Sequence, residues 1–279
     1  MDQTENKQYL LKGKFIYLVT LFFFTVCSFS QEKNVVIKSA GSFDRNELAY
    51  PDGNILTENG TKKVHLTHDN MDIFSKKSIF FQKRNSFIAT GSVHVKQGDS
   101  INLFCDSLNY DGLTRKFSSF GSVKFINDDM ELNSNVLFFD RITNEIYFNE
   151  NGKIIDSIST IESKEGKYLI DEKKYEFKDN VIVKNPDYTI TSNMMDYFLN
   201  SQLTLFYKYS TIITDVYNIF CNEGFYDPQK KIGIFKKDAK VNSNSRTVFG
   251  DSIFFDEYKK YASACGNIKI IDEKENLII

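Results

Sequence analysis

Residues 89–111 read ATGSVHVKQGDSINLFCDSLNYD, and apolar and polar side chains alternate in much of this stretch. Val93 and Val95 flank His94, and this period of two predicts a strand with one apolar and one polar face. Tyr110, near the end, belongs to a column of aromatic residues spaced 29 positions apart: Phe81, Tyr110, Phe139, Tyr168, Tyr197, Tyr226 and Phe255. A fixed period of this size predicts stacked repeats that bury their apolar faces against one another.

Two further columns of apolar residues keep the same step. The first contains Phe74, Leu103, Leu132, Ile161, Ile190, Ile219, Val248 and Leu277. The second contains Val95, Phe125, Ile154, Val183, Ile212, Val241 and Ile270, with one extra residue between Val95 and Phe125. No segment after Gln31 keeps a helical period. The columns therefore predict an all-β chain, an elongated two-sheet architecture of about eight 29-residue repeats.

The first thirty residues differ from the rest. Three lysines precede an apolar run over residues 15–29, and Ser28 and Ser30 supply the small side chains of a cleavage site before Gln31. Residues 1–30 are thus predicted to be a cleaved signal peptide. The run is shorter than the ~20 residues that span a bilayer, which argues against an uncleaved anchor. Bulky Val26 argues against lipidation at Cys27.

The remaining chain is predicted to have two parts. Residues 31–59 carry a short strand-like run at Val35, Val36 and Ile37 and turn chemistry at 51–54, and are expected to form an irregular N-terminal layer. Residues 60–279 form the β-repeat domain. Its eighth unit stops at Ile279 without a polar cap, so we expect the domain to be truncated at its C-terminal end.

Composition excludes some functions. The net charge of −2 offers no basic excess that could neutralise phosphates, so nucleic acid is not expected as a partner. Three cysteines follow the predicted cleavage site, an odd number with no disulfide framework. Cys105 and Cys221 share a column of otherwise small residues, which indicates packing and no redox or metal role.

Two groups of polar residues could carry chemistry. Asp111 and Asp140 lie one repeat apart, as do Asp227 and Asp256, and paired carboxylates can act as acid and base. Aspartates that recur where turns recur are better explained as turn initiators. His65, His68, Asp69 and His94 could hold a metal, but solvated outer-face histidines fit the pattern better. No catalytic residue, metal or cofactor is therefore predicted.

The apolar interior is the feature that remains. If the two sheets splay apart at one edge, the inner face becomes a hydrophobic trough suited to acyl chains, because burial stabilises by about 0.8 kcal/mol per methylene without precise hydrogen-bond geometry. The residues expected to line this groove are Leu103, Tyr110, Phe125, Leu132, Phe139, Ile154, Ile161, Val183, Ile190, Tyr197, Ile212 and Ile219.

The repeated motif resembles the OstA/LptA-like proteins of lipopolysaccharide transport, particularly the OstA-like proteins of Bacteroidetes-type bacteria. The resemblance rests on residues 89–95 and 105–111, and the pattern recurs at 120–125, 249–256 and 266–270. It covers roughly residues 35–279. Two units depart from the motif, with Gly152-Lys153-Ile154 and Ser210-Thr211-Ile212 in place of its glycine and valine.

The resemblance implies a β-jellyroll shaped like a half-folded taco, with lipopolysaccharide or a related glycolipid bound inside by its acyl chains. It also implies a periplasmic location with a possible link to the outer membrane, end-to-end joining with other OstA/LptA-like domains, and no catalytic residues. Our hypothesis is a periplasmic, non-enzymatic bridge protein that shields lipopolysaccharide acyl chains in a hydrophobic groove. The alternatives are a secreted structural or adhesive β-repeat protein with a closed core, and a β-solenoid glycan hydrolase.

Overall fold

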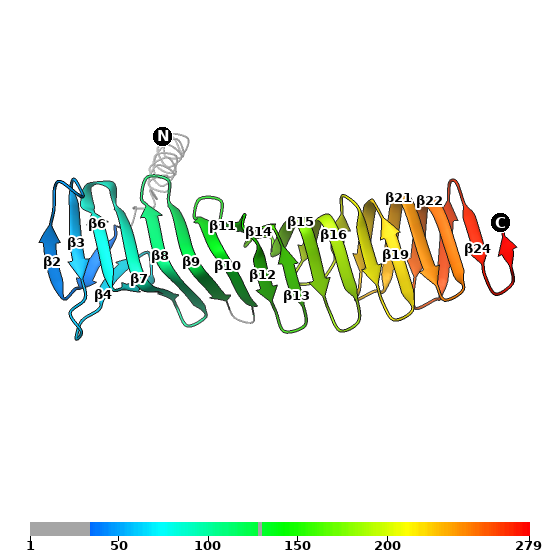
Figure 1. Ribbon diagram of the computed structural model, residues 1–279, viewed down its shortest axis with the longest axis horizontal. Coiled ribbons are helices and arrows are strands. Elements are labelled where there is room, and N and C mark those ends of the chain that lie inside the picture. Colours follow the sequence, from blue (N-terminus) through cyan, green and yellow to red (C-terminus); the bar gives the residue numbers. More distant parts are fainter. Residues whose placement is uncertain (1–33, 128–129) are drawn as a thin grey trace, which may run out of the picture. The chain divides into compact units, whose positions relative to one another are not determined.

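The computed structural model describes residues 34–127 and 130–279, and Val35–Ile279 form one compact unit. The predicted signal peptide and Cys27 lie outside the described residues. Within the unit, strands follow one another along one axis, from β2 to β24 (Figure 1). The prediction of an all-β chain is confirmed, since the elements described are strands and one short 3₁₀ helix, η1 (Gln82–Arg84).

The first ten strands are β1 (Val36–Ser39), β2 (Ser42–Arg45), β3 (Gly53–Thr57), β4 (Val64–His68), β5 (Met71–Ser75), β6 (Lys77–Phe81), β7 (Ser86–Gln97), β8 (Ile101–Asp111), β9 (Lys116–Asn127) and β10 (Met130–Asp140). The next eight are β11 (Glu145–Phe148), β12 (Gly152–Ile155), β13 (Thr160–Ser163), β14 (Glu165–Leu169), β15 (Lys174–Lys184), β16 (Thr189–Phe198), β17 (Thr204–Phe206) and β18 (Ser210–Ile213). The last seven are β19 (Tyr217–Cys221), β20 (Glu223–Asp227), β21 (Ile232–Ser243), β22 (Arg246–Asp256), β23 (Tyr261–Cys265), β24 (Lys269–Asp272) and β25 (Leu277–Ile278).

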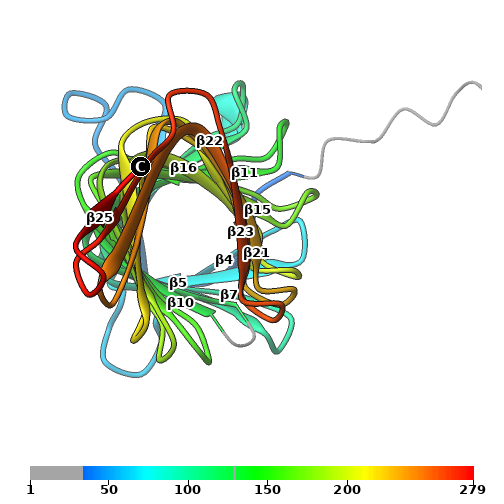
Figure 2. The same ribbon diagram turned by 90° about the vertical axis from the view of Figure 1, so that its right-hand side faces the viewer.

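The strands form two walls around a common interior (Figure 2). We call one the aliphatic wall, because directly opposed residues on its inner face form a row of mainly aliphatic side chains. This aliphatic row runs Leu66, Ile73, Val95, Leu103, Phe125, Leu132, Ile154, Ile161, Val183, Ile190, Ile212, Ile219, Val241, Val248 and Ile270. The strands that lie wholly in this wall are β1, β4, β5, β12, β13, β18, β19, β24 and β25.

The other wall is the aromatic wall, built wholly by β2, β3, β6, β11, β14, β17, β20 and β23. Its inner row runs Phe80, Phe87, Tyr110, Phe117, Phe139, Ile146, Tyr168, Tyr175, Tyr197, Thr204, Tyr226, Gly233, Phe255 and Ala262. The two inner rows together supply about half of the buried core. Burial of each large apolar side chain contributes about 1.5–3 kcal/mol, so the facing rows hold the walls together.

Long strands pass from one wall to the other. The strands β7, β9, β15 and β21 each bend where two successive residues have positive φ, as at Gly91 (81°) and Ser92 (47°). The ladder shifts register there, between Thr90 and Val93 in β7. Such bulges kink a strand without ending it. The two predicted sheets are therefore walls of one hydrogen-bonded antiparallel sheet.

The strand pairing also shows how many strands separate neighbouring residues of one sequence column. Leu103 and Leu132, one period apart, lie on either side of Phe125, so neighbours in a column are two strands apart. Three column positions were wrong. Phe74 lies opposite outward-facing His94, Leu277 lies opposite Asp272, and Ser86 lies opposite Phe81. In the first unit a one-residue slip moves Phe74 and Phe81 to the other face, and Ile73 and Phe80 take their places. In the last unit the register shifts by two residues, so Leu277 stays on the face of Ile270, and Ile279 is the residue that hydrogen-bonds with Ile270.

The segment 31–59 is more regular than expected. Its described part contains β1, β2 and β3, which pair with β4, β3 and β6 respectively. The irregular portion is limited to the turn before Gly53, where β3 begins. These pairings extend both walls toward the N-terminus. They also provide hydrogen-bond partners for backbone groups of β4 and β6.

Candidate functional site

The outer faces carry most of the residues that were predicted to be solvated, but the prediction was wrong for His68, which is 3% exposed and packs in the interior against Tyr110. Lys124 Nζ lies 2.7 Å from Glu131 Oε2, and Lys153 Nζ lies 3.0 Å from Glu162 Oε1. His65 Nε2 lies 2.7 Å from Asp72 Oδ1, and His94 Nε2 lies 2.9 Å from the side-chain oxygen of Asn102. Among the described residues, no group of three or more His, Cys, Asp or Glu side chains is placed to hold a metal ion.

The recurring aspartates stabilise turns, as predicted. Asp111 Oδ1 accepts a hydrogen bond from the backbone N–H of Leu113 (2.9 Å), and Asp140 Oδ1 accepts one from Ile142 (2.9 Å). Asp256 does the same with Lys259 (2.9 Å). Lys116 beside Asp140 holds the pKa of that carboxyl below its ordinary value, and the Lys259 amide does so for Asp256. Neither carboxyl is tuned to hold a proton as a general acid.

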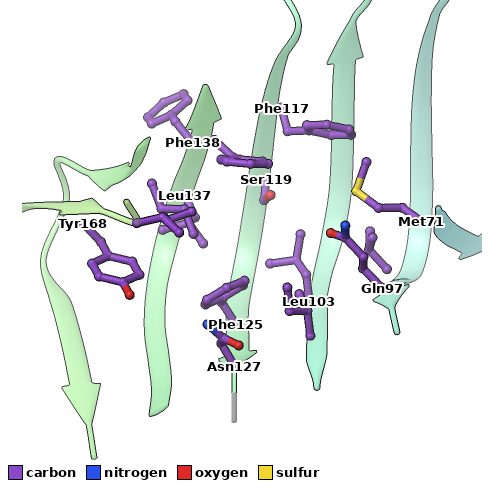
Figure 3. Close-up of a pocket in the computed structure, with 15 residues that line it drawn as sticks. Met71, Gln97, Leu103, Phe117, Ser119, Phe125, Asn127, Leu137, Phe138 and Tyr168 are labelled. Carbon is purple, nitrogen blue, oxygen red and sulfur yellow. The ribbon is translucent and has the colours of Figure 1, made fainter. Parts of the chain in front are cut away.

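An apolar cavity lies between the walls at β7–β11 and β14. Its volume is about 130 Å³. Its lining consists of Met71, Val95, Gln97, Ile101, Leu103, Phe117, Ser119, Phe125, Asn127, Leu137, Phe138, Phe139, Ile146, Tyr168 and Ile170. Figure 3 shows Phe117 and Phe138 toward one end of the cavity and Phe125 and Asn127 toward the other. The polar side chains of the lining are limited to Gln97, Ser119, Asn127 and Tyr168, so the space suits hydrocarbon.

Three of the predicted groove residues, Leu103, Phe125 and Phe139, line this cavity. The other nine are buried in the packed interior: Tyr110, Leu132, Ile154, Ile161, Val183, Ile190, Tyr197, Ile212 and Ile219. Sequence reasoning missed most of the lining, including Phe117 and Ile146. These two residues lie opposite Phe139 on the neighbouring strands, and the 29-residue column skips every second strand of the aromatic row.

The hairpin turns at the free ends of the two walls face each other, and we call them the aliphatic lip and the aromatic lip. The aliphatic lip includes turns 69–70, 98–100, 156–159, 185–188 and 214–216. The aromatic lip includes turns 112–115, 141–144, 170–173, 228–231 and 257–260. Contacts across this mouth decide whether the interior is open to solvent.

The lips touch on the N-terminal side of the cavity. Arg141 in the aromatic lip forms an ion pair with Asp69 in the aliphatic lip, and its Nη1 lies 2.9 Å from His68 Nε2. The His68 ring packs on Tyr110 of the aromatic row, with ring centroids 4.5 Å apart. These contacts join residues about seventy positions apart in the sequence, and they close the mouth at this point.

The two walls are also joined on the C-terminal side of the cavity, by aromatic packing just inside the mouth. Tyr188 is buried in the interior beside the aliphatic lip, and its ring meets that of Tyr226 edge-on at 5.9 Å. Tyr217, one period later, meets Phe255 in the same way at 4.7 Å. Burial raises the pKa of Tyr226 to about 12, so its phenol stays neutral at physiological pH. The sequence analysis did not predict that the cavity ends here. A further column with a 29-residue step changes from smaller side chains to tyrosine at this point: it contains Ile101, Met130, Ser159, Tyr188 and Tyr217.

The buried cysteines fill space at the bends. Cys105 and Cys221 are each at most 5% exposed, and burial raises the pKa of both thiols to about 12. Cys265 is exposed. A protonated thiol without access to solvent is a poor nucleophile, in agreement with the packing role predicted from their column.

No helix among the described residues is long and apolar enough to cross a membrane. Curated proteins give no match to this chain. Among solved structures, the chain is similar to LptH, the LptA homologous periplasmic component of the lipopolysaccharide transport device of Pseudomonas aeruginosa. The identity is 12%, the match covers 40% of this chain and 93% of that chain, and the TM-score is 0.38.

The model of the OstA-like protein family matches residues 32–193, which is more than half of the 279 residues. The matched region begins just before the first strand and includes every residue that lines the apolar cavity. The resemblance drawn from the repeated motif is thereby confirmed, and the chain belongs to the OstA-like protein family.

Proposed function

We propose that this protein is a periplasmic bridge component that shields the acyl chains of lipopolysaccharide, or of a related glycolipid, between its two walls. The observation that carries the proposal is the aliphatic row, an apolar inner face that continues without interruption from β4 to β24 and borders an apolar cavity. Membership of the OstA-like family supports the same function. The proposed driving force is burial of methylene groups, which needs no polar partner in the protein.

The proposal includes the location and the partners. Residues 1–30 act as a cleaved signal peptide, and residues 60–279 act as the lipid-carrying domain. The similarity to LptH, whose own description is periplasmic, is consistent with this location. Other OstA/LptA-like domains join the chain end to end, and the free edge of β2, which among the described strands pairs with β3 alone, offers backbone groups for such joining.

Lipid analysis of protein purified from its native envelope without denaturation tests the proposal. We expect mass spectrometry to detect an acylated glycolipid that remains bound through gel filtration. A variant with an altered outer face, Lys124→Gln, should retain the same lipid, because Lys124 pairs with Glu131 outside the interior. Recovery of folded protein with no lipid, or with a random sample of membrane phospholipids, would refute the proposal.

A second candidate, a structural β-repeat with a closed core, is favoured by the contacts across the mouth at Arg141 and Tyr188. It predicts the lipid-free outcome of the same experiment. A glycan hydrolase receives no support from the aspartates, because Asp111, Asp140 and Asp256 are engaged in turns.

A further inference from the structure

Arg141 is a cation that joins the two lips beside the apolar cavity. It follows β10 in the aromatic lip, and it contacts Asp69 and His68 at the turn between β4 and β5 in the aliphatic lip. Its side chain is 22% exposed and that of Asp69 is 29% exposed, so the pair lies at the surface of the mouth. A solute in the medium can therefore reach it.

The same contact adjoins the cavity. His68 lies directly opposite Met71 across the β4–β5 turn, and Met71 lines the cavity. The His68 ring also lies 6.5 Å from the ring of Phe117, another lining residue. Phe139, which lines the cavity, precedes Arg141 by two positions on the same chain segment. Separation of Arg141 from Asp69 would thus widen the entrance to this space.

The cavity is small for the proposed ligand. Its volume of about 130 Å³ is comparable with that of an apolar cavity of ~150 Å³ that takes up one benzene molecule. A glycolipid with several acyl chains needs far more room. Entry of such a lipid therefore requires the walls to separate, and the contact between the lips opposes that separation.

We propose that the Arg141–Asp69 contact is a gate to the cavity, and that a phosphate group on the entering amphiphile opens it by replacing the Asp69 carboxylate on the Arg141 guanidinium. This inference rests on the proposed function. The planar guanidinium forms paired hydrogen bonds with carboxylate or phosphate in the same geometry. Burial partly desolvates the charged guanidinium and thereby lowers the pKa of Arg141. An anionic partner that remains bound to the guanidinium therefore stabilises its charged form.

A reversible lock tests the gate. Asn70→Cys and Ile142→Cys place thiols next to Asp69 and Arg141 on opposite lips and leave the contact itself intact. Cys265→Ser removes the exposed native thiol, and buried Cys105 and Cys221 are protected. A short bis-methanethiosulfonate reagent then bridges the lips, and dithiothreitol releases them.

We expect the bridge to weaken binding of purified lipid A at least about tenfold, and reduction to restore it. The variant with Asn70→Cys and Cys265→Ser alone, treated with the same reagent, should bind as before. Equal binding by the bridged and reduced forms would overturn the gate while leaving lipid binding in place. If no form binds lipid A, the proposed function fails and the gate fails with it.

The phosphate requirement is tested with two probes, lipid A with its phosphates and the same lipid after their enzymatic removal. The unaltered protein should bind the phosphorylated form at least about tenfold more tightly, the effect of one charged hydrogen-bonded pair. Arg141→Gln should abolish this preference and Lys124→Gln should keep it. An unchanged preference in Arg141→Gln, or no preference in the unaltered protein, would overturn the role of phosphate.

Discussion

The interior between β7 and β14 contains an apolar cavity, whereas tyrosine rings cross from one wall to the other between β15 and β22, and the pockets beside them have more polar linings. The aliphatic row is similar in both regions, with Leu103 and Phe125 in the first and Ile190 and Ile212 in the second. The difference lies in the side chains that enter from the aliphatic lip. Ile101 occupies this position in the first region, and Tyr188 and Tyr217 occupy it in the second.

This difference shows that one fold can carry an apolar cavity in one region and aromatic contacts between its walls in another. A tyrosine ring that reaches Tyr226 or Phe255 bridges the two walls. The shorter side chain of Ile101 leaves a space that hydrocarbon can occupy. We infer that lipid enters first where the lip residues are short, and that tyrosines at the lip resist separation of the walls.

The largest expected effect tests what the two regions share. Ile190→Glu places a carboxylate at a position with 0% exposure, and an unpaired buried charge should destabilise the fold by at least about 3 kcal/mol. Lys184→Glu, on an exposed neighbouring residue, should change the free energy of unfolding by less than about 0.5 kcal/mol. Urea denaturation measures both. Similar losses would show that the aliphatic row does not form the inner face.

Removal of Tyr188, which bridges the walls, should create an apolar cavity beside Tyr226. Tyr188→Ala deletes a ring that is 5% exposed, and large-to-small changes of this kind cost about 3–5 kcal/mol. The new space should bind benzene, detected by nuclear magnetic resonance, whereas Leu113→Ala at an exposed lip position should alter neither stability nor binding. Loss of stability without uptake of benzene would mean that the walls collapse, and that no cavity forms beside Tyr226.

The reverse exchange should have a smaller effect. Ile101→Tyr adds a ring where the cavity offers room, so we expect a change below about 1 kcal/mol and loss of benzene binding to the cavity. Ile161→Tyr adds the same atoms at a site that is 1% exposed, and overpacking there should cost about 1–3 kcal/mol. Equal costs for the two substitutions would contradict the contrast between the regions.

The smallest effect concerns the bends, where we expect no difference between the regions. Cys105 and Cys221 have thiols with pKa raised by burial to about 12, so at pH 8 both remain protonated and shielded. A thiol reagent should therefore modify Cys265 alone in the folded protein. Mass spectrometry that finds rapid modification of Cys105 but not Cys221 would mean that the cavity region is loose beyond its lips.

Much of the fold follows from the repeat alone. Columns such as Ile161, Ile190 and Ile219 identify inward-facing residues because a period of 29 residues returns each side chain to the same face of every second strand. The slip at Phe74 could not be foreseen, because it depends on turn and bulge geometry in the first unit. The site was less predictable. Contacts such as Arg141 with Asp69 join different repeats across the mouth, and no spacing in the sequence encodes them.

Photo-crosslinking along the interior tests the central claim most directly. A photoreactive amino acid at Phe139, which lines the cavity, should capture lipopolysaccharide in living cells, with weaker capture at Tyr197 in the region of the bridging tyrosines and none at outer-face Lys124. Capture at Phe139 should persist at high salt, because acyl burial does not depend on surface charge. Equal capture at Phe139 and Lys124, or no capture at Phe139 in folded protein, would contradict lipid carriage between the walls.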